Sequence, residues 1–445
     1  MVKFSFENLT SIGKRYPHWM GLVLLGFYIC CIAFVRVYFS WDQYYWITWT
    51  QKIQQSGLGS VYTLQDCNYP PFVLYMLFFW GKSVEVLNWK LAESFGLFRA
   101  MVFMFDILTF SIFAKILSDL HLPRWPVLIF LANIGLLYNS LVWRQVDSIH
   151  TFWIILSLYF LISKKQVLAS FIYLIALNTK IQSIVFLPIF LMGFIHGYQS
   201  LNIKIAPVRK RILLTIMKVI LLGVVTQSIL LLPFILSGTT EQAVQAVTRA
   251  VDYDPVISAN AYNFWMMTVG WEKIAMSDAQ TLYLISYKQW GLLLFGLISL
   301  LVMIPLFVNL FVLHEKMSDA KRKWELFSIT SALVFGAFFL FNTQMHERYI
   351  HPAIVFSVLF ALTSRSKWAY GWTVLWSILY LGNLENMIYA WPSLHTNSFF
   401  FNPDVISKSY VVSFIILLCL LYLNYLVFPI MIKRKNASAG SHEVN

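Results

Sequence analysis

The sequence is poor in charge. Only 12% of its 445 residues are charged, which is about half the share in an average soluble domain. So few charges over this length exclude soluble globular, disordered and coiled-coil proteins. Acidic residues are the scarcer kind, 20 against 33 Lys and Arg, and the formal net charge is +13.

Cysteine is also rare. Of four cysteines, Cys30, Cys31 and Cys419 fall in apolar stretches and only Cys67 lies outside them. Neither an intramolecular disulfide nor a cysteine metal cluster is expected from this pattern. The first apolar stretch lacks a small-residue cleavage site, so we expect an anchor rather than a cleaved signal.

Apolar residues are what the sequence has in abundance, with 59% hydrophobic and 18% aromatic residues. Apolar stretches of helical length predict an all-α polytopic membrane protein with about 12 transmembrane helices, within a range of 11 to 13. We expect spans at 20–39, 97–114, 126–142, 148–163, 166–179, 181–199, 212–236, 289–313, 326–345, 349–363, 368–384 and 410–432.

The positive charge indicates the orientation of these spans. With the N-terminus inside, the inner segments hold 20 basic against 6 acidic residues and the outer segments 11 against 13. Every second loop is basic, which predicts that both termini are cytoplasmic. The basic clusters lie beside spans, where anionic lipid headgroups are the ready partner, so we expect membrane lipids and no nucleic acid as partners.

The same segmentation predicts the domain organisation. A cytoplasmic segment over 1–19 precedes a single transmembrane domain over 20–432, and a cytoplasmic tail covers 433–445. Two outer loops are long, at about 40–94 and 238–288, so we look for function on the outer face. The run Phe72 to Trp80 covers only ~13 Å and predicts a re-entrant or interfacial helix started by Pro70 and Pro71.

The first long loop begins with an aromatic helix. Asp42, Tyr45, Trp46 and Trp49 share one helical face by their spacing, a pattern that suits the membrane interface. One interpretation is an anchoring helix with a solvated Asp42, and the other is a functional carboxylate held beside stacking aromatics.

A second motif follows in the same loop. In Asp66-Cys-Asn-Tyr-Pro-Pro, the two prolines fix the chain direction and hold Asp66 and Asn68 against the membrane surface. A structural turn explains this motif equally well.

Polar residues recur at the outer ends of later spans. Each one alone is explained by a cap or a snorkelling side chain, but their restriction to one face indicates function. The motifs are Trp143-Arg-Gln-Val-Asp147, Lys180 with Gln182, Asn260-Ala-Tyr-Asn-Phe-Trp265 and His346-Glu-Arg348.

Some of the predicted spans are short for a bilayer. Spans of 14 to 16 residues reach only ~21 to 24 Å, so we expect Asp147, Lys180 and Arg348 below the outer surface in a water-accessible recess. Arg99 and Asp106 lie seven residues apart on one face and are predicted to pair, either toward this recess or as a structural ion pair.

Taken in order, these motifs resemble the GT-C glycosyltransferases. The similarity runs from Asp42 to Pro352 and is greatest to prokaryotic membrane proteins related to the GPI-anchor mannosyltransferases. The endoplasmic-reticulum glucosyltransferases that complete the N-glycan precursor are more distantly similar. The resemblance implies an inverting transfer of a hexose, mannose or glucose, from a polyprenyl-phosphate donor to an acceptor hydroxyl on the extracytoplasmic or lumenal side. The acceptor would be a glycan, a lipid or a protein, and a bacterial plasma membrane is favoured over the endoplasmic reticulum.

The resemblance also implies roles for residues. Asp42 matches the early acid of the family and would be the general base. Cations would bind the donor phosphate, namely Arg348, His346, Lys180 and Arg144. The expected substrate-binding residues are Asp66, Asn68, Tyr69, Gln145, Asp147, Gln182, Asn260, Asn263, Trp265 and Glu347.

The chain departs from the family at three of these motifs. Asn68 stands where relatives commonly carry Asp, Arg144 replaces a smaller residue, and Ile181 replaces a proline after Lys180. No His or Asp spacing has the specificity of a metal motif, so a reaction without a metal is favoured, with a divalent cation as the alternative.

Two other classes of function stay open. A transporter or flippase of lipid-linked sugars would also have about twelve spans, although related halves with a midplane site are not evident. A non-catalytic relative of the same fold is the third interpretation.

Overall fold

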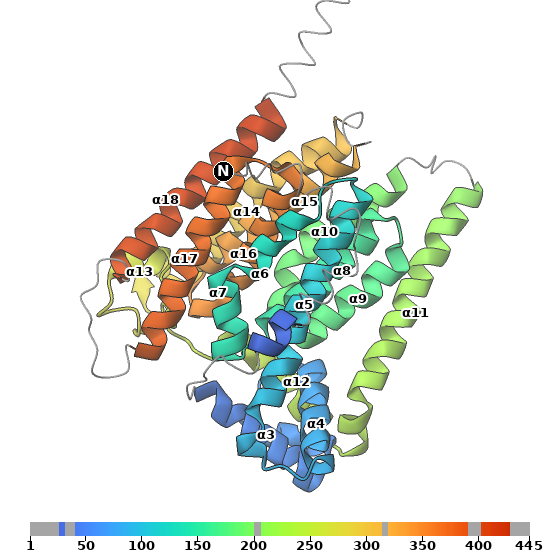
Figure 1. The fold of residues 1–445 in the computed structure, drawn as a ribbon, viewed down its shortest axis with the longest axis vertical. Helices are drawn as coiled ribbons and strands as arrows, with labels where there is room; N and C mark the ends of the chain where they lie inside the picture. The colour runs from blue at the N-terminus through green and yellow to red at the C-terminus, as the bar shows by residue number, and fades with distance from the viewer. Residues whose placement is uncertain (1–25, 32–40, 200–205, 314–318, 390–401, 428–445) are drawn as a thin grey trace, which may run out of the picture. The chain divides into compact units, whose positions relative to one another are not determined.

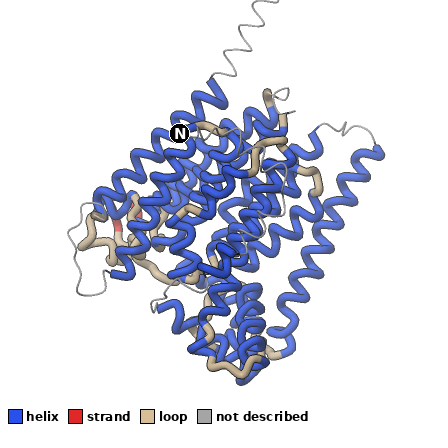
Figure 2. Tube along the Cα trace, in the orientation of Figure 1, coloured by secondary structure: helices blue, strands red, loops and turns tan. Residues whose placement is uncertain are grey.

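The computed structural model describes residues 26–31, 41–199, 206–313, 319–389 and 402–427. Contacts divide the chain into two compact units, an N-terminal unit over Met1–Asp254 and a C-terminal unit over Pro255–Asn445. Figure 2 shows helix throughout both, with one short pair of strands in the C-terminal unit. The prediction of an all-α membrane protein is confirmed in this coarse form, since the described part of the chain is helical and contains long apolar helices.

The N-terminal unit is built from long and short helices. Its α-helices are α3 (Trp41–Ser56), α4 (Pro71–Val86), α5 (Phe95–Asp119), α6 (Leu128–Leu131), α7 (Ile134–Leu137), α8 (Asp147–Ile162), α9 (Gln166–Thr179), α10 (Leu187–Gln199), α11 (Ala206–Leu236) and α12 (Thr240–Arg249). Short 3-10 and π turns join them: η1 (Leu58–Thr63), η2 (Leu91–Glu93), η3 (Trp125–Val127), η4 (Tyr138–Trp143), η5 (Ile181–Phe186) and η6 (Ala250–Asp252).

The C-terminal unit holds the rest. Its elements are α13 (Phe264–Val269), β1 (Thr281–Leu282), β2 (Ile285–Ser286), α14 (Tyr287–Phe311), α15 (Ala320–Phe341), η8 (Glu347–Ile350), α16 (His351–Ser364), α17 (Lys367–Tyr389), α18 (Pro403–Tyr422) and η10 (Leu423–Val427). Helices α15 and α16 form its core, because most residues of α15 and all but one of α16 are buried, and α14, α17 and α18 pack around α15 or α16.

Six described helices are long and apolar enough to cross a membrane, or seven if the bent pair Trp125–Leu131 and Ile134–Trp143 is one span. They coincide with the predicted spans at 97–114, 126–142, 181–199, 212–236, 289–313, 326–345 and 410–432. The spans predicted at 148–163 and 166–179 correspond to the shorter helices α8 and α9, and those at 349–363 and 368–384 to α16 and α17. The span at 20–39 lies mostly outside the described residues, as do the segments 1–19 and 433–445. The count of twelve and the single-domain organisation stay predictions.

Helix α11 exposes a large apolar surface. Of its 31 residues only Phe234 is buried, and the side chains of Ile220, Leu221 and Ile229 are all at least 60% exposed. An apolar face this large is unusual on a soluble protein and marks contact with lipid or another protein. In Figure 1, α11 runs along the edge of the N-terminal unit, while α3, α4 and α12 gather at one end of it.

The proline pair starts a helix as predicted. Pro70 is the N-cap of α4 and Pro71 its first residue, where the missing N–H costs nothing. The helix is longer than the apolar run, and one of its faces packs Val73, Leu77 and Trp80 into a core shared with α3 and α5.

The aromatic face of α3 differs from its predicted environment. Trp46 and Trp49 are each 2% exposed and lie in the core of the N-terminal unit rather than at a lipid interface. Trp46 meets the ring of Tyr69 at 5.1 Å and that of Phe98 at 5.7 Å. Spacing identified the shared face correctly, but a helix next to Tyr69 and Phe98 buries that face in protein.

Candidate functional site

Asp42 is held in place by a residue 103 positions away. The Nε2 of Gln145 donates a hydrogen bond of 2.6 Å to the Oδ2 of Asp42. Gln145 is fully buried, whereas Asp42 is half-buried in the first turn of α3. The predicted base and a predicted substrate residue are therefore in direct contact, and a rigid amide orients a carboxylate that is itself accessible.

The local backbone explains why Gln145 reaches α3. Residues Tyr138–Trp143 form a π turn, and Arg144 then adopts the left-handed conformation, with φ of +58°. This pair of irregularities turns the chain before α8 begins at Asp147. Single π turns and left-handed non-glycine residues both gather at functional sites, where the strain places a side chain.

Arg144 contacts the residue next to Asp42. Its Nη2 donates to the Oε1 of Gln43 at 2.9 Å, and its guanidinium lies 5.0 Å from the centre of the Phe95 ring. Arg144 is only 2% exposed. Adjacent residues of one motif thus engage adjacent residues of α3, which favours a positioning role for Arg144; its role in binding phosphate stays a prediction.

Asp147 and Lys180 form a buried ion pair. The Nζ of Lys180 lies 2.6 Å from the Oδ1 of Asp147, and the two side chains are 5% and 1% exposed. His150 and Ser183 extend the cluster, with His150 Nε2 at 4.0 Å from Asp147 Oδ1 and His150 Nδ1 at 3.2 Å from Ser183 Oγ. The two predicted site residues do come together.

Their surroundings differ from the expected recess. We expected Asp147 and Lys180 in a water-accessible hollow, but both are enclosed by protein. Span length sets how deep a residue lies and says nothing about the side chains packed around it, which is why the prediction of water access was wrong here. These contacts favour a structural role, and phosphate binding by Lys180 stays a prediction.

Gln182 is half-buried, and its Oε1 is buried with no hydrogen-bond partner in the described structure.

The motif around Asp66 lies beside the same helix. The Nε1 of Trp49 donates to the Oδ1 of Asp66 at 3.4 Å, and the hydroxyl of Tyr62 donates to the carbonyl of Tyr69 at 2.8 Å. Asp66 therefore lies on the face of α3 that carries Asp42, two turns further along. Asn68 lines a polar pocket in this region.

Cys67 is buried in the same turn. Burial raises the pKa of its thiol far above the usual range, which the backbone N–H of Tyr69 offsets only in part. A thiol kept protonated in this way is a poor nucleophile and metal ligand. Cys67 is thus a packing residue of the turn.

Arg99 and Asp106 are both buried on α5, at 5% and 3% exposure. The pairing of the two stays a prediction.

In the C-terminal unit, the late motif forms a compact charge cluster. The carboxylate of Glu347 accepts a hydrogen bond of 2.9 Å from Arg348 Nη1 and lies 3.9 Å from His346 Nδ1. Glu347 is 1% exposed, whereas the side chains of Arg348 and His346 are 10% and 21% exposed. A buried acid thus holds the guanidinium of Arg348 beside the imidazole of His346, and the guanidinium can present positive charge to an anion.

The segment before α13 is tied to this cluster by its backbone. The N–H of Ala259 donates to the carbonyl of Met345, and Asn260 forms a bridge with His346. Asn260 has a φ of +66°, and its carbonyl accepts from the Nδ2 of Asn383 at 2.8 Å. Asn260 is therefore placed beside the predicted phosphate-binding residues.

Asn263 and Trp265 have structural contacts. The Oδ1 of Asn263 accepts from the N–H groups of Trp265 and Met266 and so caps α13, and its Nδ2 donates to the carbonyls of Phe339 and Asn342. The indole of Trp265 donates to the carbonyl of Phe341 at 2.8 Å. These contacts occupy the whole amide of Asn263, so they favour a structural role over the predicted binding of substrate.

Replacement of Asn263 tests that role. We expect Asn263→Ala to lower the free energy of unfolding by ~2 kcal/mol, because the cap and two buried carbonyl partners are lost together. Asn402→Ala is the matched control, since Asn402 caps α18 through Asp404 and Val405 where water can replace it. Unfolding in mixed micelles measures both, and equal losses would contradict the assignment.

Some residues of these clusters could not be identified from the sequence alone. Asp278 is 1% exposed and accepts hydrogen bonds from Thr343 at 2.7 Å and Gln344 at 2.8 Å, which braces the turn before His346. His150 stands three residues after Asp147 on a helix, a spacing that does predict a contact. Asp278 carries no such signal, because its partners come from a distant segment.

The described residues bear on whether a metal site is present. Within the described ranges, no group of three or more His, Cys, Asp or Glu side chains is arranged to hold a metal ion. A divalent cation stays an alternative, and no step proposed below depends on one.

No protein-family model matches the sequence, and no protein with a curated description is similar to it. The likeness to the GT-C glycosyltransferases therefore rests on the order of the motifs alone.

Proposed function

We propose that this chain is an inverting glycosyltransferase that moves a hexose from a polyprenyl-phosphate carrier to an acceptor hydroxyl on the extracytoplasmic side. The observation that supports it most is the hydrogen bond between Gln145 and Asp42. This bond connects two of the motifs that resemble the GT-C family, which are 103 residues apart in the sequence. A carboxylate oriented by a buried amide and left half-exposed is what a general base needs.

The reaction assigns each group a task. The acceptor oxygen attacks the anomeric carbon, the bond from that carbon to the phosphate oxygen breaks, and the carbon inverts. The acceptor proton passes to the carboxylate of Asp42, and the electron pair leaves with the polyprenyl phosphate. The resemblance to the GT-C family assigns Arg348 and His346 the task of stabilising the charge that develops on this phosphate. A guanidinium has five N–H donors, so it can hold a carboxylate and a phosphate together.

The proposal includes the finer features of the fold. We propose a GT-C arrangement of about twelve spans with both termini cytoplasmic, in a bacterial plasma membrane. Mannose and glucose are the favoured hexoses, and the donor lipid and surrounding membrane lipids are the expected partners.

Comparison of lipid-linked sugars tests the function in cells. We expect cells without this gene to accumulate one polyprenyl-phosphate hexose and to lack the glycan that receives it. Chromatography of extracted lipid-linked sugars, with mass spectrometry of the cell-surface glycans, measures both pools. Identical pools and glycans with and without the gene would contradict the proposal.

Arg348→Ala tests the phosphate contact. We expect KM for the lipid-linked donor to rise at least ~10-fold, because a charged hydrogen bond is worth ~1.5–3 kcal/mol. Arg348→Lys is the matched control. It keeps the positive charge beside Glu347, so KM for the donor should rise less than in Arg348→Ala. A donor titration of the purified protein measures KM, and an unchanged KM in Arg348→Ala would remove this residue from the phosphate site.

A further inference from the structure

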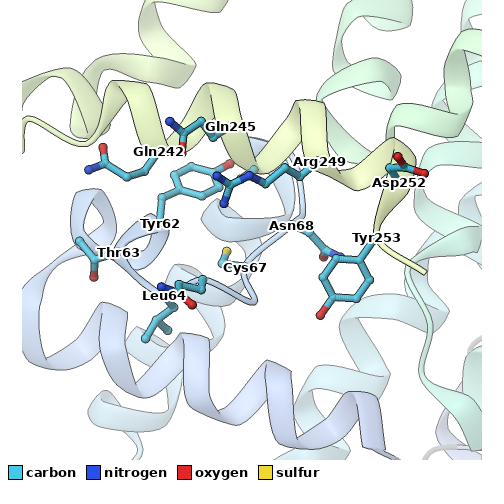
Figure 3. Close-up of a pocket in the computed structure, with 12 residues that line it drawn as sticks. Tyr62, Thr63, Leu64, Cys67, Asn68, Gln242, Gln245, Arg249, Asp252 and Tyr253 are labelled. Carbon is cyan, nitrogen blue, oxygen red and sulfur yellow. The ribbon is translucent and has the colours of Figure 1, made fainter. Parts of the chain in front are cut away.

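A polar pocket lies in the N-terminal unit between α12 and the loop that follows α3. Its volume is 590 Å³, within the ~300–1,000 Å³ of typical ligand sites. Figure 3 shows Gln242, Gln245 and Arg249 on α12, Tyr253 at the end of the segment that follows α12, and Asn68 on the loop near Tyr253.

The lining is unusual for a pocket of this size. Ligand pockets are mostly apolar with a few polar groups, but this one carries two primary amides from Gln242 and Gln245, a guanidinium from Arg249, the amide of Asn68 and hydroxyls from Thr63 and Tyr253. Amides and hydroxyls both donate and accept hydrogen bonds. A ligand dense in hydroxyl groups, which also donate and accept, satisfies such a lining best.

Tyr253 adds a phenol to the lining of the pocket. Burial first, and then the nearby groups of Tyr45 and Asp254, raise the pKa of Tyr253 to about 12. A phenol is protonated at neutral pH with or without this shift, so Tyr253 counts among the hydroxyl groups of the lining.

The two walls of the pocket are fixed to each other. The Oγ1 of Thr239, at the start of α12, donates to the carbonyl of Gly59 at 2.5 Å, and the rings of Tyr62 and Phe234 are 4.8 Å apart. The two segments approach so closely that a Cβ on Gly59 would lie 2.0 Å from Ser237 Oγ. A pocket built this way is preformed, which lowers the entropic cost of binding.

The pocket wall is next to the helix that carries Asp42. Gln65 and Cys67 line the pocket, and Asp66 between them contacts α3 through Trp49. Tyr45 packs on Trp49 at 5.8 Å, and Trp49 donates to Asp66. Asp42 lies on the same helical face, three residues before Tyr45 and ~10 Å along the axis from Trp49.

We propose that this pocket binds the inner sugar residues of an oligosaccharide acceptor and directs its terminal hydroxyl along α3 to Asp42. The proposal rests on the proposed glycosyl transfer and adds the class of the acceptor to it. The separation of Asp42 from the pocket requires an extended acceptor, because a ligand that only filled the pocket would not reach the base. An oligosaccharide provides both the hydroxyl density and the length.

Cross-linking in native membranes identifies the ligand without relying on activity. A diazirine-bearing amino acid replaces Gln245 in the full-length protein, and in the matched control it replaces Val244, which is 55% exposed and outside the pocket lining. After illumination, mass spectrometry of the tryptic peptide reads the adduct. We expect hexose-containing adducts at position 245 and not at 244. Peptide adducts, lipid without sugar, or no adduct at 245 would overturn the proposal.

Kinetics with the purified full-length protein supply the second test, with oligosaccharides released from the cells' own lipid-linked glycans as acceptors. Arg249→Met should raise KM for the acceptor ~10-fold or more and leave KM for the donor and kcat at saturating acceptor within about two-fold. Lys90→Met is the matched control, since Lys90 is 82% exposed and is not among the residues that line the pocket. An unchanged acceptor KM in Arg249→Met would overturn the pocket assignment.

The two proposals fail differently in these tests. Sugar transfer by the wild type without a hexose adduct at 245 would remove the pocket and leave the glycosyltransferase. A hexose adduct without any sugar transfer would remove the proposed reaction, and with it the acceptor role of the pocket.

Discussion

Asp42→Asn is expected to abolish sugar transfer while the protein still binds its lipid-linked donor. A positioned general base contributes ~10²–10⁴-fold to rate, and an amide cannot take up the acceptor proton. The substitution is nearly isosteric and keeps an oxygen that can accept from Gln145, so the fold and the 2.6 Å contact have no reason to change. We therefore expect kcat to fall by at least ~100-fold with KM for the donor within a few-fold of the wild type.

A radiolabelled transfer assay with purified protein measures this effect. Glu93→Gln is the matched control, because Glu93 is a 69% exposed acid of the same unit that pairs with Lys90 at 3.3 Å. It should turn over at the wild-type rate. Turnover by Asp42→Asn at the wild-type rate would remove the base assignment, and loss of donor binding would show that the variant had lost more than a base.

Asp147→Ala is expected to cause the largest loss of stability in the chain's buried polar clusters. It would leave the ammonium of Lys180, 5% exposed, buried without the carboxylate that now lies 2.6 Å away. Removal of one partner of a buried ion pair costs ~3–5 kcal/mol in free energy of unfolding. We expect a loss of that size in mixed-micelle unfolding, with a matching drop in Tm.

Two further variants separate the charge from the loss of volume. The double variant Asp147→Leu with Lys180→Met removes both charges and should recover most of the stability. Glu85→Ala breaks the surface pair with Lys82, whose side chains are 52% and 39% exposed, and should cost less than ~1 kcal/mol. A double variant as unstable as the single one would contradict the ion-pair account, as would an Asp147→Ala protein as stable as Glu85→Ala.

The sequence predicted those features that depend on local chemistry. The start of α4 at Pro71 follows from the geometry of proline. The apolar runs that form α11 and α14 are long enough to be predicted as membrane spans from the sequence alone. The shared face of Asp42, Tyr45 and Trp49 also follows from helical spacing alone, as does the joint placement of His346, Glu347 and Arg348 in one short turn.

Features that depend on packing were not predictable. Trp46 and Trp49 are buried because residues such as Tyr69 and Phe98 cover this face of α3. The local sequence around the two tryptophans does not predict that packing. Gln145 reaches Asp42 because the chain forms a π turn and Arg144 adopts the left-handed conformation. The spacing of apolar residues in the sequence does not predict either irregularity. The pocket depends on the close approach of Gly59 to the end of α11, a contact between segments 178 residues apart.

The burial of Asp147 and Lys180 illustrates the same limit for charged residues. Their place at the ends of short helices was read correctly from the sequence, and the structure brings them together. Whether water reaches such a pair depends on the side chains of neighbouring helices, here including His150 and Ser183. A charge pattern therefore predicts a partner better than it predicts exposure.

Release of the hexose from its carrier distinguishes a glycosyltransferase from a transporter, and reconstitution tests it. The purified wild-type protein is reconstituted in proteoliposomes with a polyprenyl-phosphate hexose labelled in the sugar and with the cells' own oligosaccharides as acceptors. We predict that the label moves from the lipid fraction to the oligosaccharide with inverted anomeric configuration, and that Asp42→Asn leaves it in the lipid. Label that stays on its carrier with the wild type, or crosses the bilayer still attached to it, would contradict a glycosyltransferase.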